Sequence, residues 1–246
     1  MPTKIHVGTA GWSIPRPNQA RFPPGDSLLA RYAKLLPAVE INSTFYRPHR
    51  ASTFERWAAS VPRAFRFSVK IPREITHDHR LSGSAKLLKT FLADVAPLDS
   101  RLGCLLVQLA PGHEFDARIA RSFFTSLRKQ FDGGIALEPR HTSWFGSSTD
   151  RLLNNFEVAR VAADPPRAEG DGEPAGWPGL AYFRLHGSPR IYYSSYEDDY
   201  LHTLAGRLRG LQRARIPTWC IFDNTTLGAA TSNALSLVER FATYSI

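Results

Sequence analysis

Paired polar residues stand two positions apart where several short apolar runs of the sequence end. The pairs are Glu40 with Asn42, Glu138 with Arg140, and Arg184 with His186. Residues two apart on an extended strand point to the same side, so each pair can face one site. Histidine titrates near neutral pH, and a carboxylate in an enclosed site can do so too. Glu138 and His186 are therefore predicted to transfer protons, with Glu40 as a further catalytic candidate.

Three cations near the same run ends predict an anionic ligand. They are Lys70, Arg140 and Arg184. The planar guanidinium of arginine binds phosphate or carboxylate oxygens in pairs, and lysine adds a compact charge. We therefore predict a clamp for a small anionic, phosphate-bearing substrate. The acid–base groups would act on that substrate, and phosphoester hydrolysis is one reaction of this kind.

Other polar and aromatic residues near the run ends complete the predicted substrate site. They are Asn42, His77, Gln108, His141, Asp164, Tyr193 and Asn224. Amide, imidazole and carboxylate groups offer hydrogen bonds, and a tyrosine ring can stack on a sugar or a base. We expect these residues to surround the substrate between the clamp and the proton-transferring groups.

A structural interpretation of the same charges stays open. Glu40, Glu138 and Asp164 would then neutralise the neighbouring cations in a buried network without touching a substrate. In this interpretation His186 is a core histidine, hydrogen-bonded to Asp164 or to a backbone carbonyl.

A divalent metal is another open alternative. The three carboxylates could hold Mg²⁺, Mn²⁺ or Zn²⁺ together with His77, His141 or His186. Against this, Lys70 and Arg184 would repel a metal unless a substrate phosphate lay between them. No local spacing such as H-E-x-x-H marks particular metal ligands, so the sequence assigns none and the metal stays an open alternative.

The elements that must position these residues are short, nearly continuous apolar runs. We predict strands at Lys4–Thr9, Ala38–Asn42, Phe65–Lys70, Gly103–Leu109, Gly134–Glu138, Val158–Asp164, Leu180–His186 and Thr218–Asn224. Runs without polar alternation indicate strands that are covered on both faces, as in a parallel sheet.

Stretches with helical spacing separate most of these runs. One example is Ile119, Phe123, Leu127 and Phe131, which recur on one face of a helix. Alternating strands and helices in this number predict an α/β fold, a TIM-type (β/α)₈ barrel forming one domain over residues 1–246. Residues 165–179, rich in Pro, Gly and acidic residues, predict a loop in place of the helix between strands six and seven. An open doubly wound sheet is less favoured because no G-x-G-x-x-G turn occurs.

In a barrel of this kind the active site lies at the carboxyl ends of the strands. The polar pairs and the cations described above follow the ends of the predicted strands. We therefore expect them to meet in one cavity at that end of the barrel.

The composition limits the possible classes of protein. The 246 residues are 43% hydrophobic, which is enough for a substantial core and excludes a disordered chain. Two cysteines form no disulfide framework, and no apolar run is long enough for a membrane span. The first residues lack the apolar stretch of a signal peptide. We expect a cytoplasmic protein without a membrane partner.

Several motifs together resemble a known family. They are Gly8–Trp12, Asn42–Tyr46, Val69-Lys70 with Thr76-His77, Glu138–His141 with Trp144, Arg184–Gly187, and Asn224. In this order they are similar to the YecE-like family, domain of unknown function 72. The resemblance implies a TIM-type barrel and supplies no reaction. The chain departs from the family pattern at two positions. A Pro-Pro pair is usual where Ala110 stands, and a second Asn is expected where Asp223 stands.

The favoured hypothesis is an enzyme acting on a phosphate-bearing anion by acid–base chemistry. The net charge of +9, from 31 Lys plus Arg against 22 Asp plus Glu, keeps nucleic-acid binding or processing as an alternative. A non-catalytic sensor of a small anion is a third hypothesis.

Overall fold

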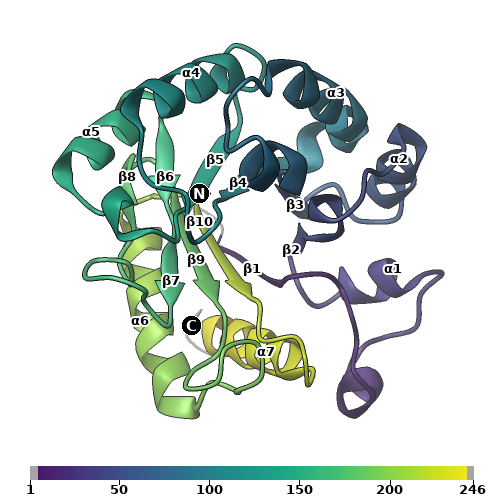
Figure 1. The fold of residues 1–246 in the computed structure, drawn as a ribbon. Helices are drawn as coiled ribbons and strands as arrows, with labels where there is room; N and C mark the ends of the chain where they lie inside the picture. Colours follow the sequence, from purple (N-terminus) through teal and green to yellow (C-terminus); the bar gives the residue numbers. More distant parts are fainter. Residues whose placement is uncertain (1–4, 243–246) are drawn as a thin grey trace.

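The computed structural model describes residues 5–242 and shows parallel strands surrounded by helices (Figure 1). The strands are β1 (Ile5–Thr9), β2 (Ala38–Ile41), β3 (Arg66–Lys70), β4 (Leu102–Gln108), β5 (Gly134–Glu138), β6 (Val158–Arg160), β7 (Ala162–Asp164), β8 (Ala175–Gly176), β9 (Ala181–Leu185) and β10 (Thr218–Phe222). The α-helices are α1 (Leu28–Tyr32), α2 (Ala51–Ala59), α3 (Ala85–Val95), α4 (Ala117–Arg128), α5 (Ser147–Asn155), α6 (Asp198–Arg213) and α7 (Ala229–Ala242).

Each predicted strand has a counterpart that ends within two residues of the prediction. Lys4, at the start of the first predicted strand, lies outside the described residues. The predicted sixth strand is divided at Val161 into β6 and β7. The alternation of strands and helices is therefore that of an α/β protein.

The strands form two hydrogen-bonded sheets in the orders β1-β10-β9-β7 and β2-β3-β4-β5-β6-β8. Within the described residues every strand pair is parallel except β6 with β8. β6 pairs with β5 and β7 pairs with β9, and only Val161 separates the two strands. One continuous segment therefore joins the two sheets.

The two sheets also meet where β1 lies beside β2. There the Tyr32 side chain bridges the two strands in place of a direct backbone hydrogen bond. The Tyr32 hydroxyl accepts a hydrogen bond from the Thr9 backbone N–H (2.9 Å) and donates to the Ala38 carbonyl (3.0 Å). Further along, the Gly11 N–H donates to the Glu40 carbonyl at 2.8 Å. A Cβ at Gly8 would lie 2.1 Å from the Ala38 carbonyl oxygen, so the close approach of the two strands requires glycine there.

Residues 165–179 contain no helix, as the composition of this segment predicts. The segment instead holds the short strand β8 and folds back on β6 and β7. The Ala163 N–H donates to the Asp171 carbonyl (2.9 Å), and an Asp171 carboxylate oxygen accepts from the Arg167 N–H (2.7 Å). Backbone hydrogen bonds thus attach this helix-free segment to β6 and β7.

The helices bury one apolar stripe each, as α4 illustrates. The Asp116 carboxylate accepts hydrogen bonds from the N–H groups of Arg118 and Ile119, which fixes the start of the helix. Phe123 and Leu127, one helical turn apart, are both buried.

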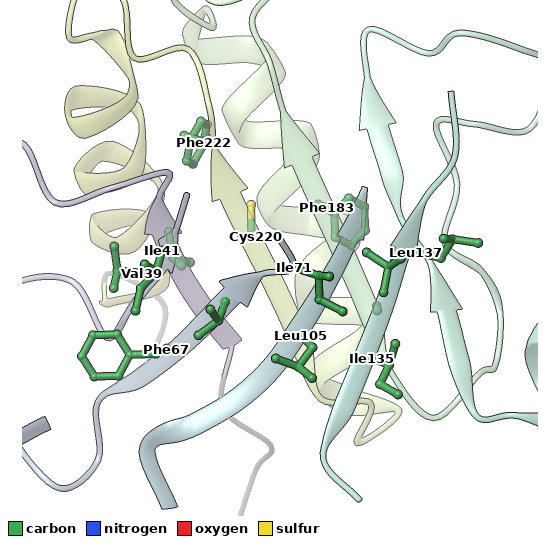
Figure 2. Packing of buried hydrophobic residues seen from close by; sticks show 14 of the residues in the cluster. Val39, Ile41, Phe67, Ile71, Leu105, Ile135, Leu137, Phe183, Cys220 and Phe222 are labelled. Carbon is green, nitrogen blue, oxygen red and sulfur yellow. The ribbon is translucent and has the colours of Figure 1, made fainter. Parts of the chain in front are cut away.

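Strand residues of alternate parity contribute to two different apolar clusters. Val39, Phe67, Leu105 and Ile135 belong to the larger cluster, which also contains residues of the helices (Figure 2). The opposite parity contributes a smaller cluster that includes Ala38, Cys104, Leu106, Ala136, Ala159, Tyr182, Trp219 and Ile221. Because side chains alternate along a strand, the residues that follow this second set define the site described next.

Candidate functional site

A fully buried arginine lies at the centre of the polar residues. Arg184 on β9 donates to both oxygens of Glu40 on β2, from Nε (3.1 Å) and Nη2 (2.7 Å). Its Nη1 donates to Glu138 Oε2 on β5 at 2.6 Å, and Nη2 also donates to Asp223 Oδ2 at 3.0 Å. Arg184 has no exposed surface. The guanidinium thus joins carboxylates from three other segments, and most of its donors are used.

His186 lies between two of the same carboxylates. Its Nδ1 is 3.0 Å from Asp223 Oδ2, and its Nε2 is 3.0 Å from Glu138 Oε1. An ionised carboxylate only accepts hydrogen bonds, so this geometry suits an imidazole that is protonated on both nitrogens. We name the group of Glu40, Glu138, Arg184, His186 and Asp223 the ion cluster.

Neutral residues hold the carboxylates of the ion cluster from the sides. Gln108 Nε2 donates to Glu138 Oε2 at 2.8 Å, and the Tyr182 hydroxyl lies 2.7 Å from Glu40 Oε2. Tyr182 also lies 2.8 Å from the Ser68 hydroxyl. These contacts restrain both glutamates in addition to their ion pairs.

The electrostatics of the ion cluster favour its charged form. Burial raises the pKa of Glu138, but Arg184 and His186 outweigh burial and hold that pKa well below its usual value. The pKa of Asp223 is lowered by the same two cations against the effect of burial. Burial lowers the pKa of His186, but the charge of Glu138 and the hydrogen bonds to Asp223 and Glu138 together outweigh burial, so the net shift is upward.

A cavity of about 550 Å³ lies against the ion cluster at the carboxyl ends of the strands. It is lined by Ala10, Asn42, Phe45, Tyr46, Lys70, Arg73, His77, Gln108, Arg140, Tyr192, Asp223 and Thr225. Asp223 is the one carboxylate among these lining residues, and Arg184 and His186 already bind it. The cations of the lining are Lys70, Arg73 and Arg140, so the cavity is positively charged.

Lys70 projects into this cavity from the end of β3. Its Nζ lies 4.0 Å from the centre of the Phe45 ring and makes no hydrogen bond or ion pair with residues 5–242. Burial, together with repulsion from Arg184, lowers the pKa of Lys70 to about 8. The amine therefore changes its charge close to neutral pH.

The two arginines of the cavity keep unused donors, in contrast to Arg184. Arg140 Nη2 donates to the Tyr192 hydroxyl at 3.2 Å, and its Nε stands 3.8 Å from Glu138 Oε1. Arg140 Nε and Asn42 Oδ1 are buried polar atoms without a hydrogen-bond partner among the described residues. Such atoms at a cavity wall are suited to a ligand. Arg73 forms an exposed ion pair with Asp78.

His77 belongs to the cavity as a neutral group. Its Nδ1 lies 2.9 Å from the Thr76 hydroxyl, and its ring contacts Phe45 edge to face. Burial and the neighbouring charge of Lys70 lower the pKa of His77 to about 4. At neutral pH this imidazole can exchange hydrogen bonds with a ligand but adds no charge.

The predicted site residues fall into three groups. Those that line the cavity are Asn42, Lys70, His77, Gln108 and Arg140. Those that lie beneath it in the ion cluster are Glu40, Glu138, Arg184 and His186. Those that lie outside both are His141, Asp164, Tyr193 and Asn224.

Each residue of the third group has other contacts. Asp164 accepts from the Tyr196 hydroxyl at 2.8 Å and lines a separate cavity, so its predicted place beside the glutamates needs correction. His141 lies 2.8 Å from the Ser143 hydroxyl. Tyr193 stacks under Arg190, and Asn224 donates to the Ser194 carbonyl.

The predicted clamp of Lys70 and Arg184 also needs correction. Arg184 faces three carboxylates instead of the cavity. Glu40 and Glu138 come from β2 and β5, which are not sheet neighbours of β9, and Asp223 follows the neighbouring strand β10. Arg73 and Arg140 accompany Lys70 at the cavity wall. Asp223 was absent from the predicted site, although its place two residues after Ile221 puts it on the same face as the smaller apolar cluster.

Among residues 5–242, no three His, Cys, Asp or Glu side chains are grouped so that they could hold a metal ion. The fold does not bring together the three carboxylates that the sequence offered as metal ligands. Asp164 lies apart, and the oxygens of Glu40 and Glu138 are engaged by Arg184.

Comparisons with known sequences identify relatives. A family model described as "Protein of unknown function DUF72" matches residues 6–245. The UPF0759 protein YecE of Escherichia coli K12 is 30% identical over 166 residues, which cover 65% of this chain and 59% of that protein. The UPF0759 protein YunF of Bacillus subtilis 168 is 23% identical over 269 residues, which cover 96% of this chain and 94% of that protein. The family resemblance seen in the motifs is confirmed.

Solved structures share the fold. A DUF72 family protein of Thermotoga maritima has a TM-score of 0.80 at 26% identity, covering 97% of this chain and 99% of that one. A DUF72 family protein of Enterococcus faecalis has a TM-score of 0.80 at 22% identity, covering 99% and 97%. None of the described helices combines the length and apolarity that crossing a bilayer requires.

Proposed function

The chain belongs to the DUF72 family, whose description gives no activity, and from the chemistry of its site we propose an enzyme that acts on a phosphate-bearing anion by acid–base catalysis. One observation carries the proposal. Lys70, Arg73 and Arg140 line a cavity whose one carboxylate, Asp223, is already bound by two cations beneath it. A cavity with excess positive charge and unused donors favours an anion.

The binding half of the proposal rests on Arg140. Its Nε forms a long ion pair with Glu138 (3.8 Å) but makes no hydrogen bond among the described residues, so a phosphate oxygen would supply the acceptor that this guanidinium lacks. Asn42 on the same wall offers an unused acceptor for a ligand hydroxyl. Together these atoms suit a ligand that carries both a phosphate and hydroxyl groups.

The acid–base half of the proposal rests on Lys70. With its pKa near 8, this amine can accept a proton from a substrate and return it at neutral pH. Glu138 and His186, predicted from the sequence as the proton-transferring pair, are buried and do not line the cavity. They contact the lining residues Gln108, Arg140 and Asp223. We propose that Glu138 and His186, as members of the ion cluster, set the electrostatic potential on the side of the cavity that the ion cluster borders.

We also propose that the fold is a closed TIM-type barrel in one domain, residues 1–246. In such a barrel the carboxyl ends of the strands are where an active site lies. The shared β6–β7 segment and the Tyr32-bridged contact of β1 with β2 support closure. So does Arg184, which contacts carboxylates on β2 and β5, neither of them a sheet neighbour of β9. A crystal structure with an open sheet, or with two separate cores, would contradict this proposal.

Calorimetric titration tests the binding half. Inorganic phosphate and glycerol 3-phosphate should bind at one site per chain, whereas glycerol should not bind measurably. Affinity should fall as the salt concentration rises, since exposed charges are screened. Absence of phosphate binding at low salt would overturn the proposal. No particular contact of the described residues favours the nucleic-acid or sensor alternative. A sensor would return its anion unchanged after prolonged incubation.

A further inference from the structure

Lys70 differs from the other lysines that the structure describes. Its side chain is buried, with 5% of the residue surface exposed, whereas Lys34, Lys86, Lys89 and Lys129 are exposed. Its amine rests against the face of Phe45 and has no polar partner within residues 5–242. An amine in a ligand-sized cavity, held by a ring and free of acceptors, is placed to react with a ligand.

The charge surroundings of Lys70 increase its reactivity. A neutral amine is a nucleophile and an ammonium ion is not. With a pKa of about 8, roughly a quarter of Lys70 is neutral at pH 7.5, compared with roughly one part in a thousand for an ordinary exposed lysine. Burial is the first cause of this shift and repulsion by Arg184 is the second.

The cavity also offers a way to orient the ligand. Arg73 and Arg140 line the same cavity as Lys70, so a phosphate bound to them leaves the rest of the ligand within the cavity that the amine faces. Gln108 and Tyr192 line the same space and supply hydrogen-bonding groups for an oxygen on the reacting carbon.

We propose that Lys70 forms an imine with the carbonyl carbon of a phosphate-bearing aldehyde or ketone. This inference rests on the proposed function for the phosphate and adds the substrate class. The lone pair of Lys70 Nζ attacks the carbonyl carbon, the C=O π electrons move to oxygen, and that oxygen takes a proton. The resulting carbinolamine loses its hydroxyl, with a proton, as water and leaves a C=N bond. Amine plus carbonyl thus give imine plus water, with no oxidant or reductant.

Trapping with borohydride tests the inference on the unmodified protein. Pyridoxal 5′-phosphate, an aldehyde that carries a phosphate, is added in equimolar amount at pH 7.5, and borohydride then reduces any imine to a stable amine. Peptide mass spectrometry locates the label. We expect Lys70 to be labelled at least about tenfold more than Lys34, Lys86, Lys89 or Lys129, because of its larger neutral fraction. Equal labelling of all these lysines would overturn the inference.

Two comparisons separate this inference from the proposed function. Pyridoxal, which lacks the phosphate, should label Lys70 about tenfold less, and inorganic phosphate should suppress labelling by pyridoxal 5′-phosphate. If Lys70 is labelled selectively but the phosphate makes no difference, the imine stands and the phosphate site fails. If phosphate binds by calorimetry but Lys70 stays unlabelled, the imine is overturned and the phosphate site stands. Lys70→Arg should abolish the label at this position, and the matched control Lys86→Arg should leave it unchanged.

Discussion

Arg184 and Arg140 lie close together at the same end of the strands, yet their environments are opposite. Arg184 has no exposed surface and donates to Glu40, Glu138 and Asp223. Arg140 keeps 15% of its side chain exposed, and its Nε has no hydrogen-bond partner among the described residues. Two arginines that look equivalent in the sequence therefore differ in what they can still bind.

The difference follows from the energetics of buried charge. An ion taken out of water must find partners in the protein, and Arg184 finds them in carboxylates from other strands. A ligand would have to displace one of these carboxylates to reach it. Arg140 borders solvent, so it can remain partly unpaired until an anion arrives. We call the ion cluster the floor of the cavity, and the lining cations Lys70, Arg73 and Arg140 its wall. The floor fixes the structure beneath the cavity, and the wall selects the ligand.

The largest expected effect is loss of stability when Arg184 is removed. Arg184→Met should reduce the free energy of unfolding by about 3–5 kcal/mol, because buried carboxylates are left without their partner. Urea denaturation followed by circular dichroism measures this. The matched control Arg140→Met should cost less than about 1 kcal/mol. If both variants lost the same free energy of unfolding, Arg184 and Arg140 would not differ in their structural role.

The sequence predicted the strands well for a physical reason. Runs such as Gly134–Glu138 and Ala181–Leu185 are covered on both faces, and their continuous apolarity marks them clearly. The division of the sixth strand and the short strand β8 were not predicted. They depend on how residues 165–179 fold back on the sheet, and no periodicity records such a contact.

The candidate site was predicted less completely. The cavity lies at the strand ends that the sequence indicated. Contacts between side chains of different strands decide which charges are paired, and sequence spacing does not record those contacts. Asp164 and Asp223 both follow apolar runs. Asp223 shares its parity with Trp219 and Ile221 of the smaller cluster, whereas Asp164 shares its parity with Ala162 of the larger one. The alternation of side chains along a strand therefore distinguishes Asp223, which belongs to the ion cluster, from Asp164, which does not.

The second prediction concerns the wall. Arg140→Gln should weaken phosphate binding about ten- to hundredfold, equivalent to about 1.5–3 kcal/mol, because a charged donor to the anion is lost. Calorimetric titration measures the change. Arg118→Gln, on the exposed face of α4, is the matched control and should leave binding unchanged. If Arg140→Gln binds phosphate as the parent does, Arg140 belongs to the structural floor.

The third prediction concerns the coupling within the floor. Glu138→Gln should lower the pKa of His186, because the charge of the Glu138 carboxylate is the largest of the effects that raise it. Since the folded pKa of His186 is raised, its protonation stabilises the fold fully below the unfolded pKa of about 6.5. That contribution is lost as the pH rises through the folded pKa.

NMR titration of the His186 ring resonances measures this shift directly. His202 on α6 lies away from the ion cluster and serves as the internal control in the same spectra. A His186 pKa that is equal in the parent and in Glu138→Gln would show that Asp223 alone holds the imidazolium.

The smallest expected effect tests whether the wall cations can be tuned without disturbing the floor. Arg73 lines the cavity but forms an ion pair with Asp78, and both side chains are more than half exposed. An exposed pair of this kind contributes about 0–1 kcal/mol to stability, so Asp78→Asn should change the free energy of unfolding by less than about 0.5 kcal/mol. The freed guanidinium should raise phosphate affinity about two- to threefold at low salt, and the gain should shrink as salt screens it. Asp94→Asn, a neutralised carboxylate on α3 that does not pair with Arg73 in the described structure, controls for net charge. An equal gain in both variants would mean that the overall charge of the protein, and not Arg73 at the wall, attracts the anion.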